Sequence, residues 1–261
     1  MPFASNRGVK IHYEVEGKGS PLVLQHGFTG NIQEWRDLGY VEALKSSHKL
    51  ILIDARGHGG SDKPVGSDDY SGKLMAEDVV AVLDDAQVKA AAYLGYSMGG
   101  WIGYNLIRYH TDRFTHFIIG GMTPYPFKIE KMQIGMFLRG LLQAGLEGGS
   151  KASIDWVENL EGAPMAEYRR KGYYEMNFPS LSSLFEAMVR GFAAGTPLNP
   201  TKTPCLIFAG ELDEFHAGAK RASQELPNAK FISLSGIDHI QAFSEVDTVV
   251  ANATRLFNGK G

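Results

Sequence analysis

The sequence predicts an α/β domain with a doubly wound, mostly parallel sheet. Short apolar runs recur along the 261 residues, at 22–24, 50–53, 90–94, 117–119, 206–208 and 231–234. Such runs, rather than an alternating pattern, are what a strand needs when helices cover both faces of its sheet. Segments with helical periodicity lie between the runs. Alternation of strands and helices over the whole length is typical of this fold class.

The individual elements follow in order from this pattern. Residues 9–15 alternate apolar and polar side chains, which indicates a half-buried strand, and the glycines at 17 and 19 indicate a turn after it. Three helical segments are expected on their periodicity, at 75–86, 101–110 and 246–256. No internal repeat interrupts the order, so the chain is interpreted as one core with an insertion.

Residues 122–200 are that insertion. Six of the nine methionines and ten of the 28 aromatic residues fall in this stretch, which contains no convincing buried strand. We expect a helical cap at 122–200, inserted into a core domain made of 1–121 and 201–261. Its methionines could simply fill an ordinary helical core. They also suit a lid over an apolar pocket, because methionine is flexible and adapts to irregular surfaces.

Composition excludes several other classes of protein. The 26 basic and 29 acidic residues are interspersed and give a formal net charge of −3, which argues against a nucleic-acid-binding stripe or a membrane-binding face. The first residues lack the apolar stretch of a signal peptide, and no segment approaches the roughly 18 apolar residues of a bilayer span. The single cysteine, Cys205, cannot form an internal disulfide and lies in an apolar run. We expect a cytoplasmic monomer or homodimer that binds a small molecule.

The strongest chemical signal is the sequence Gly-Tyr-Ser-Met-Gly around Ser97. It follows the apolar run 90–94 and precedes a helical segment. A strand that turns sharply into a helix strains the backbone at the turn and passes so close to itself that only small residues fit two positions to either side. The turn would raise the Ser97 hydroxyl above the sheet edge. We therefore expect Ser97 to be a nucleophile.

A serine hydroxyl needs a base and a group that orients the base. Of the eight histidines, His239 stands out because it follows the last expected strand, in a loop at the carboxyl edge of the sheet. For the acid we favour Asp213 over Glu211 and Glu214, since all three follow the expected strand at 205–208. The loop after the preceding strand, 120–124, holds no carboxylate, which strengthens this choice.

Catalysis by such a nucleophile also needs hydrogen-bond donors for the negative charge that develops in the reaction. The amide of Met98 lies at a helix N-terminus, where donors and dipole favour an anion. The amide of Phe28 follows His26 and Gly27 at the end of the expected strand 22–25. We expect these two amides to form the oxyanion hole. We also expect Gly27, Tyr96 and Trp101 to contact the substrate.

These residues resemble the α/β-hydrolase fold superfamily and, within it, the lid-bearing serine esterases. The resemblance covers nearly all of the chain and rests on 26–28, 54–62, the turn around Ser97, 210–213 and 238–239. It implies an eight-stranded sheet with a helical cap between strands. It also implies acyl transfer by Ser97, His239 and Asp213 without metal or organic cofactor. The segment 54–62 resembles a structural turn of the family, so Arg56 and His58 are given no catalytic role.

Several activities of this superfamily stay open. Serine at position 97 argues against the haloalkane dehalogenase and epoxide hydrolase branches, which use aspartate there. A carboxylesterase with an apolar acyl or aromatic substrate is favoured, and a lactonase or carbon–carbon hydrolase is the main alternative. A perhydrolase is less expected because Phe28 stands where those relatives have tryptophan. A non-enzymatic receptor for a small ligand is the alternative from a different class.

Overall fold

An eight-stranded sheet forms the centre of the molecule. The computed structural model describes residues 2–259, apart from the side chain of Tyr168. Across the sheet the order is β1 (Phe3–Asn6), β2 (Val9–Glu16), β4 (His48–Ile53), β3 (Ser20–Gln25), β5 (Ala91–Tyr96), β6 (Phe114–Gly120), β7 (Cys205–Gly210) and β8 (Ala229–Leu234). The pairs β1–β2 and β2–β4 are antiparallel, and all other pairs are parallel. The expected α/β class with a mostly parallel sheet is confirmed.

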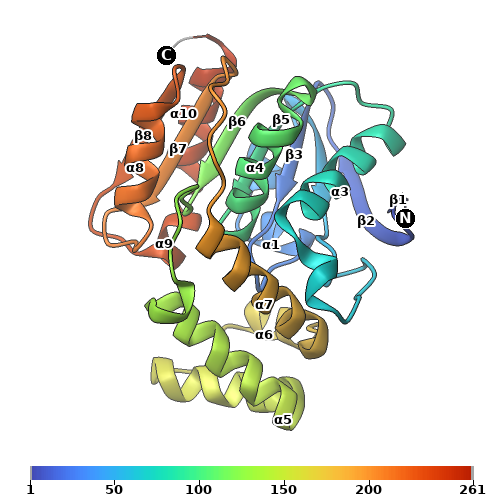
Figure 1. Ribbon diagram of the computed structural model, residues 1–261, viewed down its shortest axis with the longest axis vertical. Coiled ribbons are helices and arrows are strands. Elements are labelled where there is room, and N and C mark those ends of the chain that lie inside the picture. The colour runs from blue at the N-terminus through green and yellow to red at the C-terminus, as the bar shows by residue number, and fades with distance from the viewer. Residues whose placement is uncertain (1, 260–261) are drawn as a thin grey trace.

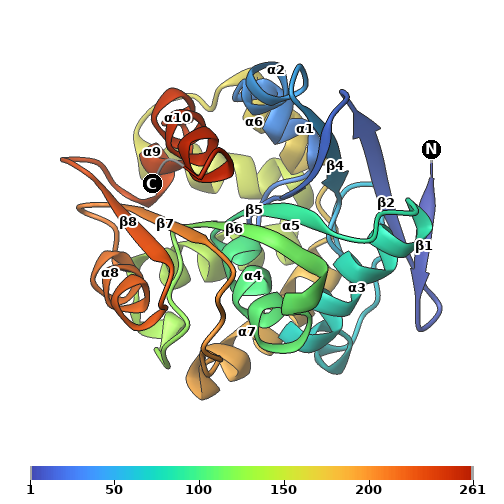
Figure 2. The same ribbon diagram turned by 90° about the horizontal axis from the view of Figure 1, so that it is seen from above.

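Helices cover both faces of this sheet, as Figure 2 shows from above. One face carries α3 (Gly72–Asp85), α4 (Met98–Tyr109) and α8 (His216–Glu225); the other carries α1 (Ile32–Asp37), α2 (Tyr40–Leu44) and α10 (Val246–Phe257). In β3, Leu22 and Leu24 pack toward the second face and Val23 packs toward the first, and all three are fully buried. The continuous apolar runs therefore reflect strands that are buried on both sides.

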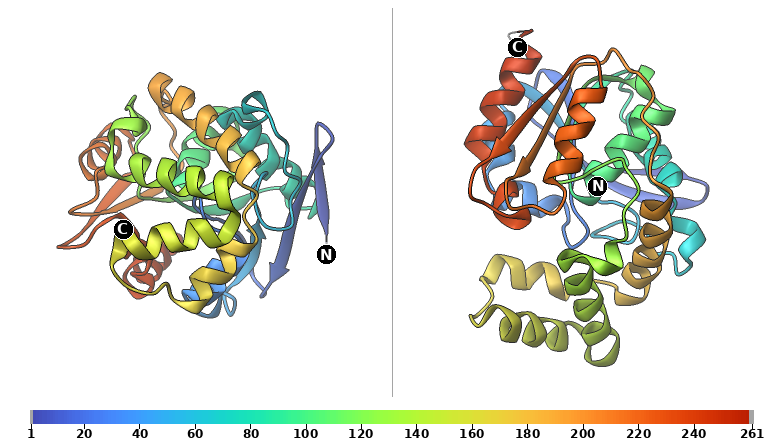
Figure 3. Two further views of the ribbon diagram at one scale, coloured as in Figure 1. Left: turned by 90° about the horizontal axis from the view of Figure 1, so that it is seen from below. Right: turned by 60° about the vertical axis from the view of Figure 1, so that its left-hand side comes forward.

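The segment between β6 and β7 is helical and lies at one end of the sheet (Figure 1). It contains the 3-10 turn η3 (Ile129–Lys131) and the helices α5 (Gln133–Glu161), α6 (Glu167–Tyr174) and α7 (Phe178–Ala194). These cap helices sit below the core in the right view of Figure 3 and in front of it in the left view, which looks from below. Helix α7 is tied to the core by Ser180, whose hydroxyl donates to the carbonyl oxygen of Lys63 at 2.8 Å.

Helix α5 is two arms joined at Gly149. This glycine has φ 71° and ψ −165°, a conformation that only glycine adopts readily. The arms fold against each other, as the green and yellow helices of Figure 3 show. The Ser153 hydroxyl donates to the carbonyl oxygen of Leu141 at 2.8 Å, and the rings of Phe137 and Trp156 lie 5.6 Å apart. The turn at Gly149 thus brings aromatic side chains of both arms to one place.

Within residues 2–259, no helix combines the length and the apolar character that crossing a bilayer requires.

Candidate active site

The backbone around Ser97 makes the sharp turn that the glycine spacing predicts. Ser97 joins β5 to α4 with φ 54° and ψ −112°, one of three non-glycine residues with positive φ in the described chain. A Cβ atom on Gly95 would lie 2.4 Å from the carbonyl oxygen of Gly99, and one on Gly99 would lie 2.1 Å from that of Gln25. Larger residues would therefore open the turn. The strain at Ser97 is held in place by this close packing.

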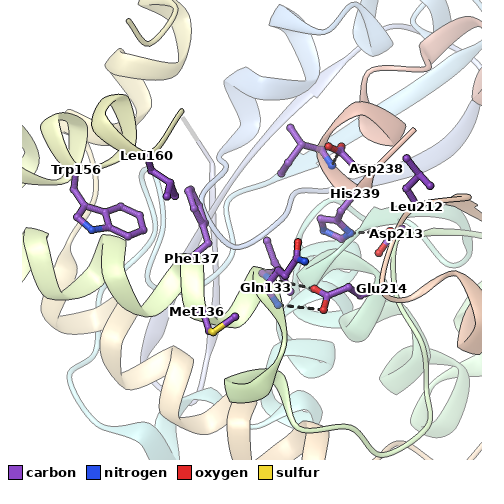
Figure 4. Close-up of a pocket in the computed structure, with 12 residues that line it drawn as sticks. Gln133, Met136, Phe137, Trp156, Leu160, Leu212, Asp213, Glu214, Asp238 and His239 are labelled. Carbon is purple, nitrogen blue, oxygen red and sulfur yellow. Dashed lines mark hydrogen bonds and ion pairs between the residues drawn. The ribbon is translucent and has the colours of Figure 1, made fainter. Parts of the chain in front are cut away.

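Ser97, His239 and Asp213 form one chain of hydrogen bonds. The Ser97 Oγ lies 3.0 Å from Nε2 of His239, and Nδ1 of His239 lies 2.8 Å from Oδ2 of Asp213. Figure 4 shows the contact between His239 and Asp213. A carboxylate can only accept, so Nδ1 carries the proton, and Nε2 of the neutral ring is free to accept the serine proton. The structure brings together the three residues that the sequence singled out from distant segments.

The environment of Asp213 differs from that of its two rivals. Its side chain is 1% exposed, and its second oxygen, Oδ1, accepts from the backbone amide of Phe215 at 2.9 Å. The Glu211 carboxylate instead accepts from Ser235 and Gly236. The Glu214 carboxylate accepts from two backbone amides of α5. Of these three, only Asp213 contacts His239. Its buried carboxylate is hydrogen-bonded through both oxygens, as a buried charge requires, whereas Glu211 and Glu214 are exposed.

The position of His239 differs in one respect from the loop that was expected. His239 is the first residue of a short helix, α9 (His239–Phe243). Asp238 caps this helix by accepting from the amides of Ile240 and Gln241, and the Gln241 side chain accepts from the amide of Asp238. The sequence Asp-His-Ile-Gln is a capping box, which the sequence analysis did not use. The cap fixes the backbone that carries the imidazole.

Two free backbone amides lie beside Ser97. A Cβ atom on Gly27 would lie 3.5 Å from the Cβ of Ser97, so the segment 26–28 passes directly alongside the serine. Within the described part of the chain, neither the amide of Phe28 nor that of Met98 donates to a protein acceptor. Met98 begins α4, where the helix dipole favours negative charge. Both amides are therefore without a protein acceptor beside the Ser97 hydroxyl.

His26 and His58 hold the segment that carries the Phe28 amide. His26 accepts from the amide of Ala55 through Nε2 at 3.0 Å and donates from Nδ1 to the carbonyl oxygen of Gly27 at 2.7 Å. That carbonyl belongs to the same peptide unit as the Phe28 amide. His58 Nε2 donates to the carbonyl oxygen of Phe28 at 2.5 Å. Burial lowers the pKa of His26 to about 4 and also lowers that of His58.

Tyr96 and Trp101 do not occupy the substrate-contacting positions that were expected. Both side chains are 3% exposed. The Tyr96 hydroxyl donates to the backbone carbonyl of His239, so Tyr96 lies under the histidine. Trp101 packs edge-on against Phe192 of α7, 5.2 Å between ring centroids. Tyr96 ends β5 just before the turn, Trp101 lies in the first turn of α4 after it, and both side chains point into the packed layers.

Two pockets lie between the core and the cap helices, and the first of them borders the candidate triad. The first has a volume of about 480 Å³ and contains Asp213 and His239. Its walls are mainly apolar side chains from α5, from the loop after β7 and from α9: Ile134, Met136, Phe137, Trp156, Leu160, Leu212 and Ile240. In Figure 4, Trp156, Leu160 and Phe137 lie on the side of the pocket opposite His239. The sequence analysis did not identify these wall residues individually, although it expected an apolar pocket under the cap.

The second pocket, of about 790 Å³, continues from the first, and four residues line both: Ile134, Phe137, Leu160 and Ile240. It is more polar. Five carboxylates and two cations line it: Glu34, Asp37, Glu161, Glu167, Glu175, Arg169 and Lys171. Within residues 2–259, no cluster of three or more His, Cys, Asp or Glu side chains is arranged to hold a metal ion.

A profile described as the alpha/beta hydrolase fold matches residues 20–153, just over half of the chain. The chain belongs to the alpha/beta hydrolase fold family. This hydrolase is 27% identical over 236 residues, 84% of its own length and 85% of the relative's, to a Bacillus subtilis (strain 168) protein provisionally named 2-succinyl-6-hydroxy-2,4-cyclohexadiene-1-carboxylate synthase. The resemblance drawn from the motifs around Ser97 and His239 is confirmed at the level of the family.

Solved structures of the family agree with the fold of this hydrolase. The enol-lactonase from Burkholderia xenovorans LB400 superposes with a TM-score of 0.80 at 22% identity, over 98% of this chain and 100% of the other. A thermophilic esterase from Thermogutta terrifontis superposes with a TM-score of 0.74 at 18% identity, over 99% and 98% of the two chains. At these identities the similarity establishes the shared fold, and the reaction has to be argued from the site.

Proposed function

We propose that this alpha/beta hydrolase is a serine esterase that cleaves carboxylic esters through an acyl-enzyme intermediate. The observation that carries the proposal is the chain Ser97–His239–Asp213 ending beside two unpaired backbone amides. Acyl transfer requires four parts close together: a nucleophile, a base, a group that orients the base, and donors for the oxyanion.

The geometry supports the following sequence of steps. Ser97 Oγ attacks the ester carbonyl carbon while Nε2 of His239 takes the hydroxyl proton, and the amides of Phe28 and Met98 hold the oxyanion. The tetrahedral intermediate collapses, the bond to the leaving oxygen breaks, and His239 returns the proton to the departing alcohol. Water then attacks the acyl-serine, His239 takes one of its protons, and the carboxylic acid leaves as Ser97 recovers its proton.

Serine at position 97 also argues against an epoxide hydrolase, an activity that several relatives carry in their names. Opening an epoxide through a covalent ester needs a carboxylate nucleophile, and a serine hydroxyl cannot form that ester. A lactone is a cyclic ester that the same machinery can attack. A lactonase is therefore the second candidate, and it is also the activity named for the Burkholderia structure.

The pockets indicate the kind of substrate. The apolar walls of the first pocket suit an aliphatic or aromatic acyl group next to His239. The second pocket has more carboxylates than cations, and Arg169 is already paired with Glu161 through two hydrogen bonds of 2.8 and 3.1 Å. Burial and the neighbouring Asp37 raise the pKa of Glu34 to about 7. An anionic group would meet net negative charge there, so we propose a neutral acyl group. We also propose that residues 122–200 act as the lid over it.

The test is hydrolysis of 4-nitrophenyl esters from acetate to decanoate, with a γ-lactone in the same panel and Ser97→Ala alongside. Turnover of the ester series that disappears in the variant supports the proposal, and the chain-length optimum measures the acyl pocket. Turnover of the lactone alone would make the protein a lactonase. No turnover of any ester or lactone would contradict the proposal.

A second comparison tests the charge of the substrate. The 4-nitrophenyl ester of butyrate is matched with the mono-4-nitrophenyl ester of succinate, which places a carboxylate at the far end of a chain of equal length. We expect the neutral ester to have the higher kcat/KM. Preference for the succinate ester would contradict the neutral acyl group.

A further inference from the structure

The first turn of the cap helix α5 is held by a residue from outside the cap. Met132 precedes this helix and offers no capping side chain, which leaves the first amides without a partner from their own segment. The carboxylate of Glu214 takes their place. Oε1 accepts from the amide of Gln133 at 3.1 Å and Oε2 from that of Ile134 at 3.2 Å (Figure 4). One carboxylate thus caps the helix with both oxygens.

The position of Glu214 in the chain connects this cap to the candidate triad. Glu214 directly follows Asp213, whose carboxylate contacts His239 and the amide of Phe215. Two neighbouring carboxylates on one loop therefore hold different partners: Asp213 holds the base, and Glu214 holds the start of α5. The contact joins residues that are about 80 positions apart in the sequence.

The start of α5 is also a wall of the substrate site. Ile134, whose amide Glu214 binds, lines both pockets, and so does Phe137 less than one turn further along. We propose that Glu214 is a positioning residue that sets the distance between this wall and His239, and thereby which acyl groups are bound productively. The proposal rests on the esterase function proposed above. It adds a determinant of acyl specificity that belongs neither to the triad nor to the apolar side chains of the wall, although Glu214 also borders the first pocket.

Backbone amide exchange tests the contact independently of any substrate. Glu214→Ala removes both acceptors, and Glu214→Gln places an NH₂ group against one of the two amides. Loss of a side-chain cap corresponds to about a three- to tenfold change in a local opening equilibrium, so we expect exchange at Gln133 and Ile134, followed by NMR, to accelerate by about this factor. Glu130→Gln is the matched control: it removes a charge from η3 beside the same helix end, and Glu130 makes no hydrogen bond within the described chain.

Kinetics on the ester series test the consequence. With 4-nitrophenyl hexanoate or octanoate we expect the Glu214 variants to raise KM and to lower kcat/KM about three- to tenfold, whereas the acetate ester, which does not reach the wall, changes by less than about twofold. A residue that only stabilised the fold would lower the amount of active enzyme and reduce kcat for every ester equally. Glu130→Gln should leave the chain-length profile of the wild type unchanged.

Two results would overturn the proposal. One is unchanged exchange at Gln133 and Ile134 in Glu214→Ala. The other is a loss of kcat/KM that is equal for acetate and for longer esters. If the wild type hydrolyses no ester, the esterase function fails, and the exchange experiment still decides whether Glu214 holds the cap helix.

Discussion

The hydroxyl of Tyr96 donates a hydrogen bond of 2.5 Å to the backbone carbonyl oxygen of His239. Tyr96 directly precedes Ser97 in the chain, so the strand that presents the serine also fixes the backbone of the histidine. The Tyr96 ring stacks on Phe243 of α9, with ring centroids 4.6 Å apart and planes 10° from parallel. The distance between Ser97 and His239 is therefore set by the residue beneath them as well as by the loops that carry them.

This contact predicts a specific effect of Tyr96→Phe. The phenylalanine ring can keep the stacking on Phe243, and only the hydrogen bond to His239 is lost. A buried hydrogen bond contributes about 1 kcal/mol, so we expect kcat to fall about fivefold with little change in KM. Tyr13→Phe is the control, because Tyr13 lies on β2 and the variant removes a hydroxyl bonded to Asp85 at the end of α3. Equal loss of kcat in both variants would show that Tyr96 has no positioning role.

Ser97→Ala should abolish turnover and leave the fold intact. The substitution removes one oxygen from a position whose backbone is held by Gly95 and Gly99, so thermal unfolding should stay within a few degrees of the wild type. Loss of the nucleophile costs on the order of a thousandfold or more in kcat. Activity above about a tenth of the wild type in a clean preparation would reject Ser97 as the nucleophile.

Asp213→Asn should be far more damaging than a similar change at either neighbouring carboxylate. An asparagine amide can donate to Nδ1 of His239 and so turn the ring to the tautomer in which Nε2 cannot accept the serine proton. In enzymes with such a triad, this wrong tautomer of the histidine lowers kcat about 10⁴-fold. Glu211→Gln keeps an acceptor for Ser235 and Gly236 and should retain most activity. If Glu211→Gln were the more damaging change, Asp213 would not be the acid of the triad.

The buried His26 predicts a loss of stability in mild acid. Its pKa is lowered from 6.5 to about 4 in the folded chain, chiefly by burial. As the pH falls through 6.5, the unfolded chain binds a proton here that the folded chain does not bind until about pH 4. The folded state should therefore lose about 2 kcal/mol between pH ~7.5 and ~5 through this residue. Urea unfolding at both pH values measures the free energy of unfolding. Its change between the two pH values should be smaller for His26→Gln than for the wild type. An identical change in both proteins would contradict the role of His26 in this pH dependence.

Much of the fold could be predicted because the signals are local. Continuous apolar runs located the buried strands, and the glycine spacing located the turn at Ser97. Strand β1 was not predicted, since it has four residues and is only partly buried. Helices α1 and α2 were also not predicted, since six and five residues are too short to show a helical period. Edge strands and short helices are stabilised by tertiary contacts that a sequence window does not contain.

The candidate site, too, could be predicted from the sequence only in part. Ser97 could be located from the spacing of its glycines, and His239 and Asp213 from their places after strands. The direction of the Tyr96 and Trp101 side chains could not, because it depends on the packing of α4 and α9 against other elements. The contact between Glu214 and Ile134 joins segments that are far apart in sequence, so nothing near either residue indicates it. Sequence patterns located the candidate triad better than the walls of the adjoining pockets.

Gly149 has a consequence for how this protein could acquire new substrates. It is exposed, and a Cβ atom there would meet no other atom within 4 Å, so the constraint on the position is purely conformational. Its turn places the second arm of α5, with Trp156 and Leu160, against the first pocket. Replacing it with another residue would change the angle between the arms and hence the width of the cavity. A substitution at this solvent-facing position could thus alter the range of substrates although every residue that lines the cavity stays the same.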